Sequence, residues 1–225
     1  MNLAIRHNPS FAVARATLAQ GEQISIESGA MMAMSGGVTL ESKMEGGLKK
    51  GLMRSVLGGE SLFITKLTAA IEGDWVDAAA RLPGDLAVID VDGSVNLTSG
   101  AWLLSAGSVE IDTKWGGFKN LMGGEGGFLI RANGTGQVVC SCYGAMEIYD
   151  LAEGETLVLD SGHLVAYSDG LQFQTRMVTS RLMQTLKSAE GLVFEFTGPG
   201  RVWAQTRNPG ELVSWLTTEL PFSRD

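Results

Sequence analysis

The sequence of 225 residues is short of the residue types that build metal centres and disulfide frameworks. It contains two cysteines, two histidines and five prolines. Cys140 and Cys142 are separated by one residue, and so close a pair rarely reaches the geometry of a disulfide. We expect both to lie buried on one face of a strand. Because His7 and His163 are the only imidazoles, the sequence predicts no metal site and no cofactor.

The sequence also lacks a long apolar run and an excess of positive charge. No stretch reaches the ~18 apolar residues of a membrane-spanning helix, and residues 1–9 carry no secretory signal. We therefore expect a cytoplasmic protein without a transmembrane segment. The 17 Lys and Arg stand against 25 Asp and Glu, which gives a net charge of −8. This balance argues against nucleic acid as a partner.

Glycine, by contrast, is abundant. The sequence has 30 Gly beside 44% hydrophobic residues, which is enough apolar material for a sizeable core. Many glycines with few prolines indicate many tight turns between short strands. The composition therefore favours an all-β chain over a helical bundle.

One pattern occurs three times along the chain. Glu60, Glu125 and Glu190 each precede an apolar run, and they are evenly spaced in the sequence. Ser-Gly pairs that follow alternating strands begin at Ser28, Ser99 and Ser161. The alternating pairs Val38/Leu40, Val109/Ile111 and Leu171/Phe173 are spaced from one another as these three serines are. Positions that shift together indicate homologous units rather than chance.

We therefore expect a single domain, residues 1–225, of three internal repeats with pseudo-threefold symmetry. The repeats span about 10–80, 81–142 and 143–206. In each repeat a glycine turn separates two strands, and the Ser-Gly turn leads to two more strands. The glycine turns are expected at Gly21, Gly93 and Gly154.

Short amphipathic segments are expected before each of the three glutamates. Within 47–57, Leu48, Leu52 and Val56 fall at i, i+4 and i+8, which is the spacing of one helix face. A similar segment follows Thr179, and residues 118–122 make at most one helical turn.

A C-terminal helix is expected at about 209–219. Asn208 fits the N-cap, Pro209 the first helical position and Glu211 the third. We expect its Trp215 face to pack on a sheet.

Five segments together resemble the altered-inheritance-of-mitochondria family, and the likeness covers nearly the whole chain. They are Gly59-Glu60-Ser61-Leu62-Phe63, Leu82-Pro83-Gly84-Asp85, Trp115-Gly116-Gly117-Phe118-Lys119, the run 160–166 and the run 196–203. The resemblance implies a β-prism-like fold of three related sheets, with the double-stranded β-helix topology of the tryptophan RNA-binding attenuation protein. Fungal relatives are mitochondrial inner-membrane proteins linked to cristae and respiratory-complex organisation. The resemblance supplies no catalytic residues.

Two clusters carry the residue types of a functional site. Glu60, Glu125 and Glu190 would form a hard-cation site if a threefold axis brought them together. The interpretation that we prefer has each glutamate accept backbone N–H bonds at a joint before a strand. Asp160, Ser161 and His163, with Asp169, contain the residue types of a hydrolase triad. No G-x-S-x-G motif is present, so we interpret Ser161 as a turn residue.

The stretch from 43 to 66 is locally basic. It holds Lys43, Lys49, Lys50, Arg54 and Lys66. A basic face beside leucines is typical of a weak peripheral contact with an anionic membrane or RNA, but it is also typical of a solvated surface, which we prefer.

The sequence thus predicts a non-enzymatic structural or interaction protein. We expect it to form a homo-oligomer or to scaffold a protein partner. The alternative is a module that binds RNA or a small ligand, and it rests on fold analogy. No catalytic, cofactor-binding or metal-binding residue is assigned.

Overall fold

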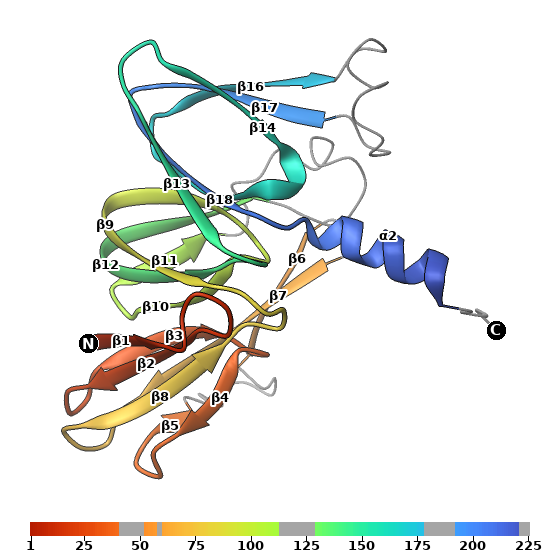
Figure 1. Ribbon diagram of the computed structural model, residues 1–225. Helices are drawn as coiled ribbons and strands as arrows, with labels where there is room; N and C mark the ends of the chain where they lie inside the picture. The colour runs from red at the N-terminus through yellow and green to blue at the C-terminus, as the bar shows by residue number, and fades with distance from the viewer. Residues whose placement is uncertain (41–51, 58–59, 113–128, 178–191, 221–225) are drawn as a thin grey trace.

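Strands make up most of the chain. The computed structural model describes residues 1–40, 52–57, 60–112, 129–177 and 192–220 (Figure 1). Within that part, the helical elements are a 3-10 turn at Ser161–His163 and one short C-terminal helix, α2 (Pro209–Glu219). The expected all-β chain with a C-terminal helix at 209–219 is confirmed.

In the part of the chain that the structure describes, the strands form three sheets, in which neighbouring strands run antiparallel. The first sheet has the order β1 (Asn2–Arg6), β2 (Val13–Leu18), β8 (Asp74–Ala79), β4 (Met31–Met34). The three-stranded sheet has the order β14 (Thr156–Asp160), β17 (Leu192–Thr197), β16 (Gln172–Met177). These two sheets lie at opposite ends of the molecule (Figure 1).

The eleven-stranded sheet lies between them. Its order is β13 (Met146–Leu151), β18 (Gly200–Gln205), β15 (Leu164–Ser168), β9 (Leu86–Thr98), β12 (Leu129–Ser141), β10 (Trp102–Ala106), β3 (Gln23–Glu27), β7 (Glu60–Thr68), β5 (Thr39–Leu40). Two further strands join it: β11 (Val109–Asp112) pairs with β12, and β6 (Leu52–Leu57) pairs with β7. Three clusters of buried apolar side chains fill the space between the layers.

The Ser-Gly turns lie where the sequence predicts them. Ser28 follows β3, Ser99 follows β9 and Ser161 follows β14, and each turn leads into the next strand. The glycine turns differ in the middle of the chain. Gly93 lies inside β9 and faces Gly134 of β12, so the expected turn at Gly93 is wrong. Both glycines have positive φ, +109° and +136°, and the two strands accommodate this backbone without a break in their pairing.

The helical interpretation of 52–57 is also wrong. These residues form β6, which pairs with β7 from Leu52 opposite Thr65 to Leu57 opposite Glu60. Leu52 and Val56 fit a helix face, but they also fit one face of a strand, where the side-chain period is two. The neighbouring strand β7 supplies backbone partners, and this tertiary pairing overrides the local pattern. The rest of the expected segments, 47–51, 118–122 and 179–190, lies outside the described residues.

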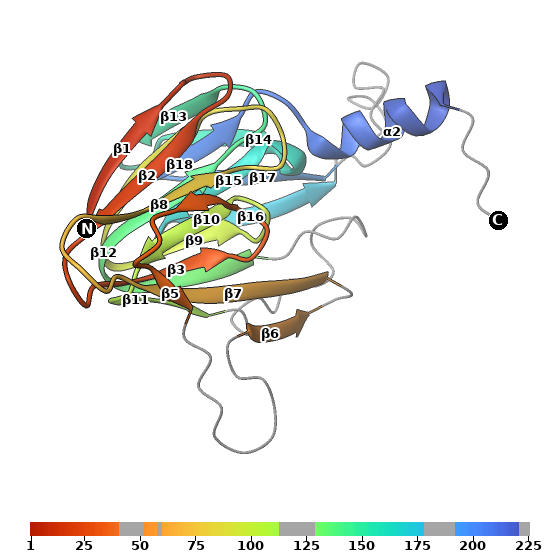
Figure 2. The ribbon, with the colours of Figure 1, turned by 90° about the horizontal axis from the view of Figure 1, so that it is seen from below.

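Helix α2 begins as its sequence predicts but does not pack as expected. The Asn208 side chain accepts a hydrogen bond from Gly210 N at 2.8 Å, and Pro209 begins the helix. The helix has no buried residue, and Trp215 is 59% exposed. Both views show α2 projecting away from the sheets (Figures 1 and 2). The predicted packing of Trp215 on a sheet is therefore wrong.

Candidate functional site

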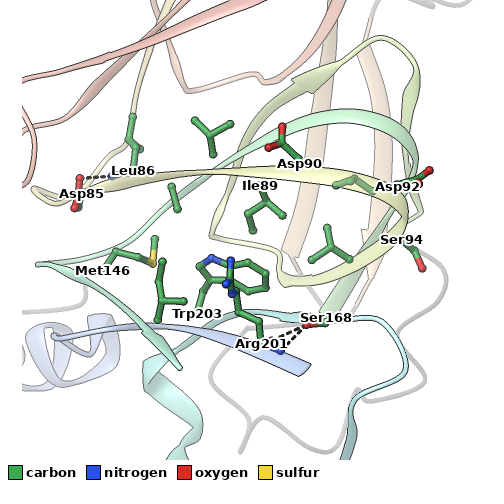
Figure 3. Close-up of a pocket in the computed structure, with 15 residues that line it drawn as sticks. Asp85, Leu86, Ile89, Asp90, Asp92, Ser94, Met146, Ser168, Arg201 and Trp203 are labelled. Carbon is green, nitrogen blue, oxygen red and sulfur yellow. Dashed lines mark hydrogen bonds between the residues drawn. The ribbon is translucent and has the colours of Figure 1, made fainter. Parts of the chain in front are cut away.

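A groove of about 730 Å³ runs along the first half of β9 (Figure 3). On one side β9 pairs with β12 from Leu86 to Thr98, and on the other it pairs with β15 only at Val95–Leu97. The second edge of Leu86–Asp92 therefore lines the groove, opposite residues of β13 and β18. The sequence analysis did not find this groove, because its walls come from strands that are far apart in the sequence.

The groove has an apolar floor, and carboxylates lie at its rim. Ile89 from β9 and Met146 from β13 point toward Trp203 of β18, and Asp90 and Asp92 point away from them (Figure 3). Strand alternation explains the split, because successive side chains of β9 point to opposite faces. A further carboxylate, Asp85, lies just before β9. Asp90 and Asp92 accept hydrogen bonds from side chains of β12 at 3.1 and 3.4 Å, so these carboxylates add negative charge at the rim and are not directed at the floor.

One arginine lies at the groove, and an aspartate of the neighbouring strand binds it. Arg201 donates from Nε to Asp150 Oδ1 at 2.5 Å and from Nη2 to Asp150 Oδ2 at 2.9 Å. The same guanidinium lies 5.8 Å from the centre of the Trp203 ring. The hydrogen bonds from Arg201 lower the pKa of Asp150. Both nitrogens that Arg201 uses in these bonds are thus occupied by Asp150.

The residues with the chemistry of a triad have separate structural partners. Asp160 accepts a hydrogen bond from Gly162 N at 2.9 Å and caps the 3-10 turn that contains Ser161. His163 Nδ1 lies 2.6 Å from the Gln205 carbonyl oxygen, and since a carbonyl only accepts, Nδ1 carries the proton. The interpretation of Ser161 as a turn residue agrees with this geometry.

Asp169 lies in a different cluster. It accepts hydrogen bonds from the Ser94 hydroxyl at 2.6 Å and pairs with Arg131 at 2.5 Å. The hydrogen bond from Ser94 lowers the pKa of Asp169 most, and the interaction with Arg131 lowers it further. Arg131 also donates to Ser94 at 2.8 Å. The cluster ties β9, β12 and the turn after β15 together, and it does not include His163.

The other candidates are mostly beyond what the structure describes. The backbone of Glu60 begins β7, while Glu125 and Glu190 lie outside the described residues, so their convergence stays a prediction. Of the basic stretch, Lys43, Lys49 and Lys50 lie outside as well. Within the described residues, no group of three or more His, Cys, Asp or Glu is placed to hold a metal ion. Nor is any helix in that part long and apolar enough to cross a membrane.

The two cysteines lie where the sequence predicts them. Cys140 of β12 and Cys142 just beyond it are buried and unbonded, and both belong to the same core cluster as Trp102. Burial raises the pKa of both thiols, that of Cys142 to about 11. A thiol is nucleophilic only as the thiolate, so neither cysteine has the properties of a reactive site.

Comparison with known proteins places the chain in a family. The family model described as mitochondrial biogenesis AIM24 matches residues 3–207. An uncharacterised protein of Streptococcus pyogenes, M6_Spy0233, is 29% identical over 233 residues, which cover 99% of this chain and 92% of that protein. The crystal structure of protein SPYM3_0169 from Streptococcus pyogenes superposes with a TM-score of 0.76 at 25% identity, over 97% of this chain and 99% of that one. The chain belongs to the mitochondrial biogenesis AIM24 family.

Proposed function

We propose that this protein is a non-enzymatic, self-associating structural protein of three units that share one strand pattern. The proposal of three units is supported by a shift in strand register that occurs three times along the chain. β4, β10 and β15 each shift register once against their partner strand, between Met31 and Ala33, between Trp102 and Leu104 and between Leu164 and Ala166. The three shifts are spaced along the sequence as the three Ser-Gly turns are. Bulges are specific backbone features, so their recurrence favours three related units and a prism-like, attenuation-protein-like topology.

A non-enzymatic role is favoured by the partners of the polar residues. Asp160, His163 and Asp169 each bind groups that shape a turn or join strands. Catalytic side chains need a free proton or lone pair directed at a substrate. The hydrogen bonds of these three residues instead hold backbone turns and neighbouring strands in place.

Helix α2 is the observation that carries the interaction role. An isolated helix of 11 residues is marginal in water, because its few hydrogen bonds hardly offset the nucleation of the first turn. Yet α2 buries none of its residues, and Val213, Trp215 and Leu220 are exposed. Large apolar side chains that stay exposed on a projecting element are typical of a surface that another protein covers.

Light scattering after size exclusion tests the proposal directly. We expect the full chain to elute with a mass of two or more copies, and the mass to fall on dilution if the association is reversible. A monomeric mass at every concentration up to about 100 μM would contradict self-association, because a useful assembly binds in or below that range.

The groove beside β9 supports a second candidate, the binding of a small cationic ligand. Its volume of about 730 Å³ lies in the range of ligand sites, and the carboxylates of Asp85, Asp90 and Asp92 place negative charge at its rim. The same charge disfavours RNA. Titration of spermidine in a calorimeter, with the Asp90→Asn and Asp92→Asn double variant as control, tests it. Binding that the double variant weakens supports a ligand site, and no heat of binding counts against it.

A further inference from the structure

Consecutive units are joined by one kind of strand pairing. At each junction, two strands lie side by side and antiparallel. One follows the Ser-Gly turn of its own unit, and the other precedes the Ser-Gly turn of the previous unit. β10 lies against β3, and β15 lies against the second half of β9. The opposed residues are Leu104↔Ile26, Ser105↔Ser25 and Ala106↔Ile24 at the first junction, and Ala166↔Leu97, Tyr167↔Asn96 and Ser168↔Val95 at the second.

Among the described residues, the corresponding strands of the first and the third unit have no such partner. In the part of the chain that the structure describes, β4 pairs only with β8, and β14 pairs only with β17. These are the strand after the Ser28 turn and the strand before the Ser161 turn. They lie at opposite ends of the molecule (Figure 1), so they do not meet within one copy.

The exposure of side chains differs between the two unpaired edges and the two occupied junctions. Val158, at the middle of β14, is 59% exposed, whereas the corresponding Asn96 of β9 is 2% exposed and Ser25 of β3 is 5% exposed. On the other side of the junction, Met34 of β4 is half-buried, and its counterparts Ser105 and Tyr167 are buried. Val158 is therefore open to solvent and Met34 is partly exposed, whereas the corresponding residues at the two occupied junctions are buried.

The sequences of the two edges lack the features that keep edge strands apart. β4 reads Met-Met-Ala-Met, and β14 reads Thr-Leu-Val-Leu-Asp. Natural edge strands usually carry Lys, Pro or other charges that block pairing with another chain. The one charge here, Asp160, caps Gly162 N. Other strands with a single partner do carry charges, such as Glu147 and Asp150 in β13.

We propose that copies of this chain join head to tail, with β4 of one copy antiparallel to β14 of the next. The register repeats that of the two internal junctions. Ala33 is the first residue after the bulge in β4, as Leu104 is in β10 and Ala166 in β15. Leu159 lies two residues before its Ser-Gly turn, as Ile26 and Leu97 do. The expected pairs are therefore Ala33↔Leu159, Met34↔Val158 and Ser35↔Leu157. This inference rests on the proposed self-association and names its interface. Such a heterologous contact builds a closed ring or an open filament.

Cross-linking between two single-cysteine variants tests the register. Met34→Cys and Val158→Cys are prepared separately, mixed and treated with a short bismaleimide, and the two buried native thiols serve as an unreactive background. Opposed residues of antiparallel strands have Cβ atoms about 5 Å apart, so the mixture should give a cross-linked dimer in denaturing gels. Neither variant alone should do so. Mixing Ile71→Cys, at another exposed position, with Val158→Cys is the matched control.

A charge at the interface tests its contribution. Val158→Lys places a charge without a partner in the proposed junction, and it should raise the concentration at which copies associate by about tenfold or more. Ile71→Lys, a change of the same kind at a 61% exposed residue, should leave association as in the wild type. If Val158→Lys fails to fold, the cross-linking result decides.

The possible results separate the inference from the proposed function. A wild-type protein that is monomeric overturns both. An oligomer that Val158→Lys leaves intact, with no cross-link in the Met34→Cys and Val158→Cys mixture, overturns the inference alone. A cross-linked dimer of Val158→Cys by itself shows a symmetric contact and also overturns it.

Discussion

Gly84 and Gly144 form an isolated parallel bridge that ties the segment before β9 to the segment before β13. Asp85 N donates to Gly144 O at 3.0 Å, and Gly144 N donates to Pro83 O at 3.1 Å. The approach is so close that a Cβ on Gly84 would lie 1.9 Å from the Cys142 carbonyl oxygen. Two segments that are far apart in the sequence are therefore held in backbone contact by the absence of a side chain.

We expect Gly84→Ala to lower the free energy of unfolding by about 3 kcal/mol, because backbone must move to admit the methyl group. Gly100→Ala is the matched control, since a Cβ there meets nothing within 4 Å and the change should stay within about 0.5 kcal/mol. Urea unfolding followed by far-UV circular dichroism measures both. A loss below about 1 kcal/mol in Gly84→Ala would contradict the close approach.

Asp77 should make the folding stability of the protein depend on pH in the acidic range. Its buried carboxylate accepts hydrogen bonds from Arg6 and from two nitrogens of Arg15, all at 2.8 Å, and Arg15 also stacks over Trp75 at 3.9 Å. The hydrogen bonds from Arg15 lower the pKa of Asp77 most, and the bond from Arg6 lowers it further. A lowered folded-state pKa stabilises the fold above the unfolded pKa of about 3.9, and this stabilisation is lost as the pH falls through the folded-state value.

We therefore expect Asp77→Asn to lower the free energy of unfolding by about 2 kcal/mol at pH 7. The difference from the wild type should shrink as the pH falls below about 4, because the wild-type carboxyl then becomes protonated as well. Asp150→Asn is the control, since its ion pair with Arg201 is exposed to solvent and contributes little to stability. Urea unfolding at a series of pH values measures the difference, which would contradict the argument if it stayed constant down to pH 2.

The cysteines should be protected from thiol reagents in the folded protein. Cys140 and Cys142 are buried, and burial raises the pKa of both, so at pH 8 the reactive thiolate is scarce and inaccessible. We expect Ellman's reagent to label neither in the native protein and both in 6 M guanidinium chloride. Rapid labelling of the native protein at pH 8 would contradict the burial.

The sequence predicted local features well where one residue decides the backbone. The N-cap at Asn208 and the turns after Ser28, Ser99 and Ser161 depend on short-range chemistry, and their positions were correct. Gly93 shows the limit of that reasoning. A glycine with positive φ is typical of a turn, but here Gly134 lies opposite, and the paired strands absorb the conformation together.

The site was harder to predict than the fold. Trp203 and Arg201 lie in a segment that the family resemblance highlighted, but nothing in it shows that Ile89 and Asp90 lie across a groove. That juxtaposition depends on β15 pairing with only the second half of β9, which is a tertiary property. For Asp160, Ser161 and His163, the missing G-x-S-x-G motif already favoured a turn over a triad, and Asp160 and His163 indeed have separate backbone partners.

Two tryptophans should separate stability from association. Trp102 is buried in the central cluster, and we expect Trp102→Ala to lower the free energy of unfolding by about 4 kcal/mol through the cavity that it leaves. Trp215 projects from α2 into solvent, so Trp215→Ala should change the stability of the single copy by less than about 0.5 kcal/mol.

The same Trp215→Ala variant should weaken association if α2 is covered by a neighbouring copy. A large aromatic that is exposed in one copy and buried in the assembly is typical of residues that dominate binding, and its loss should raise the dissociation constant about tenfold or more. Ser214→Ala, a small polar change at the neighbouring exposed position, should leave association unchanged. Light scattering over a concentration series measures both variants. Association equal to the wild type in Trp215→Ala, with Val158→Lys disruptive, would assign the interface to the strand edges and leave α2 free for a different partner.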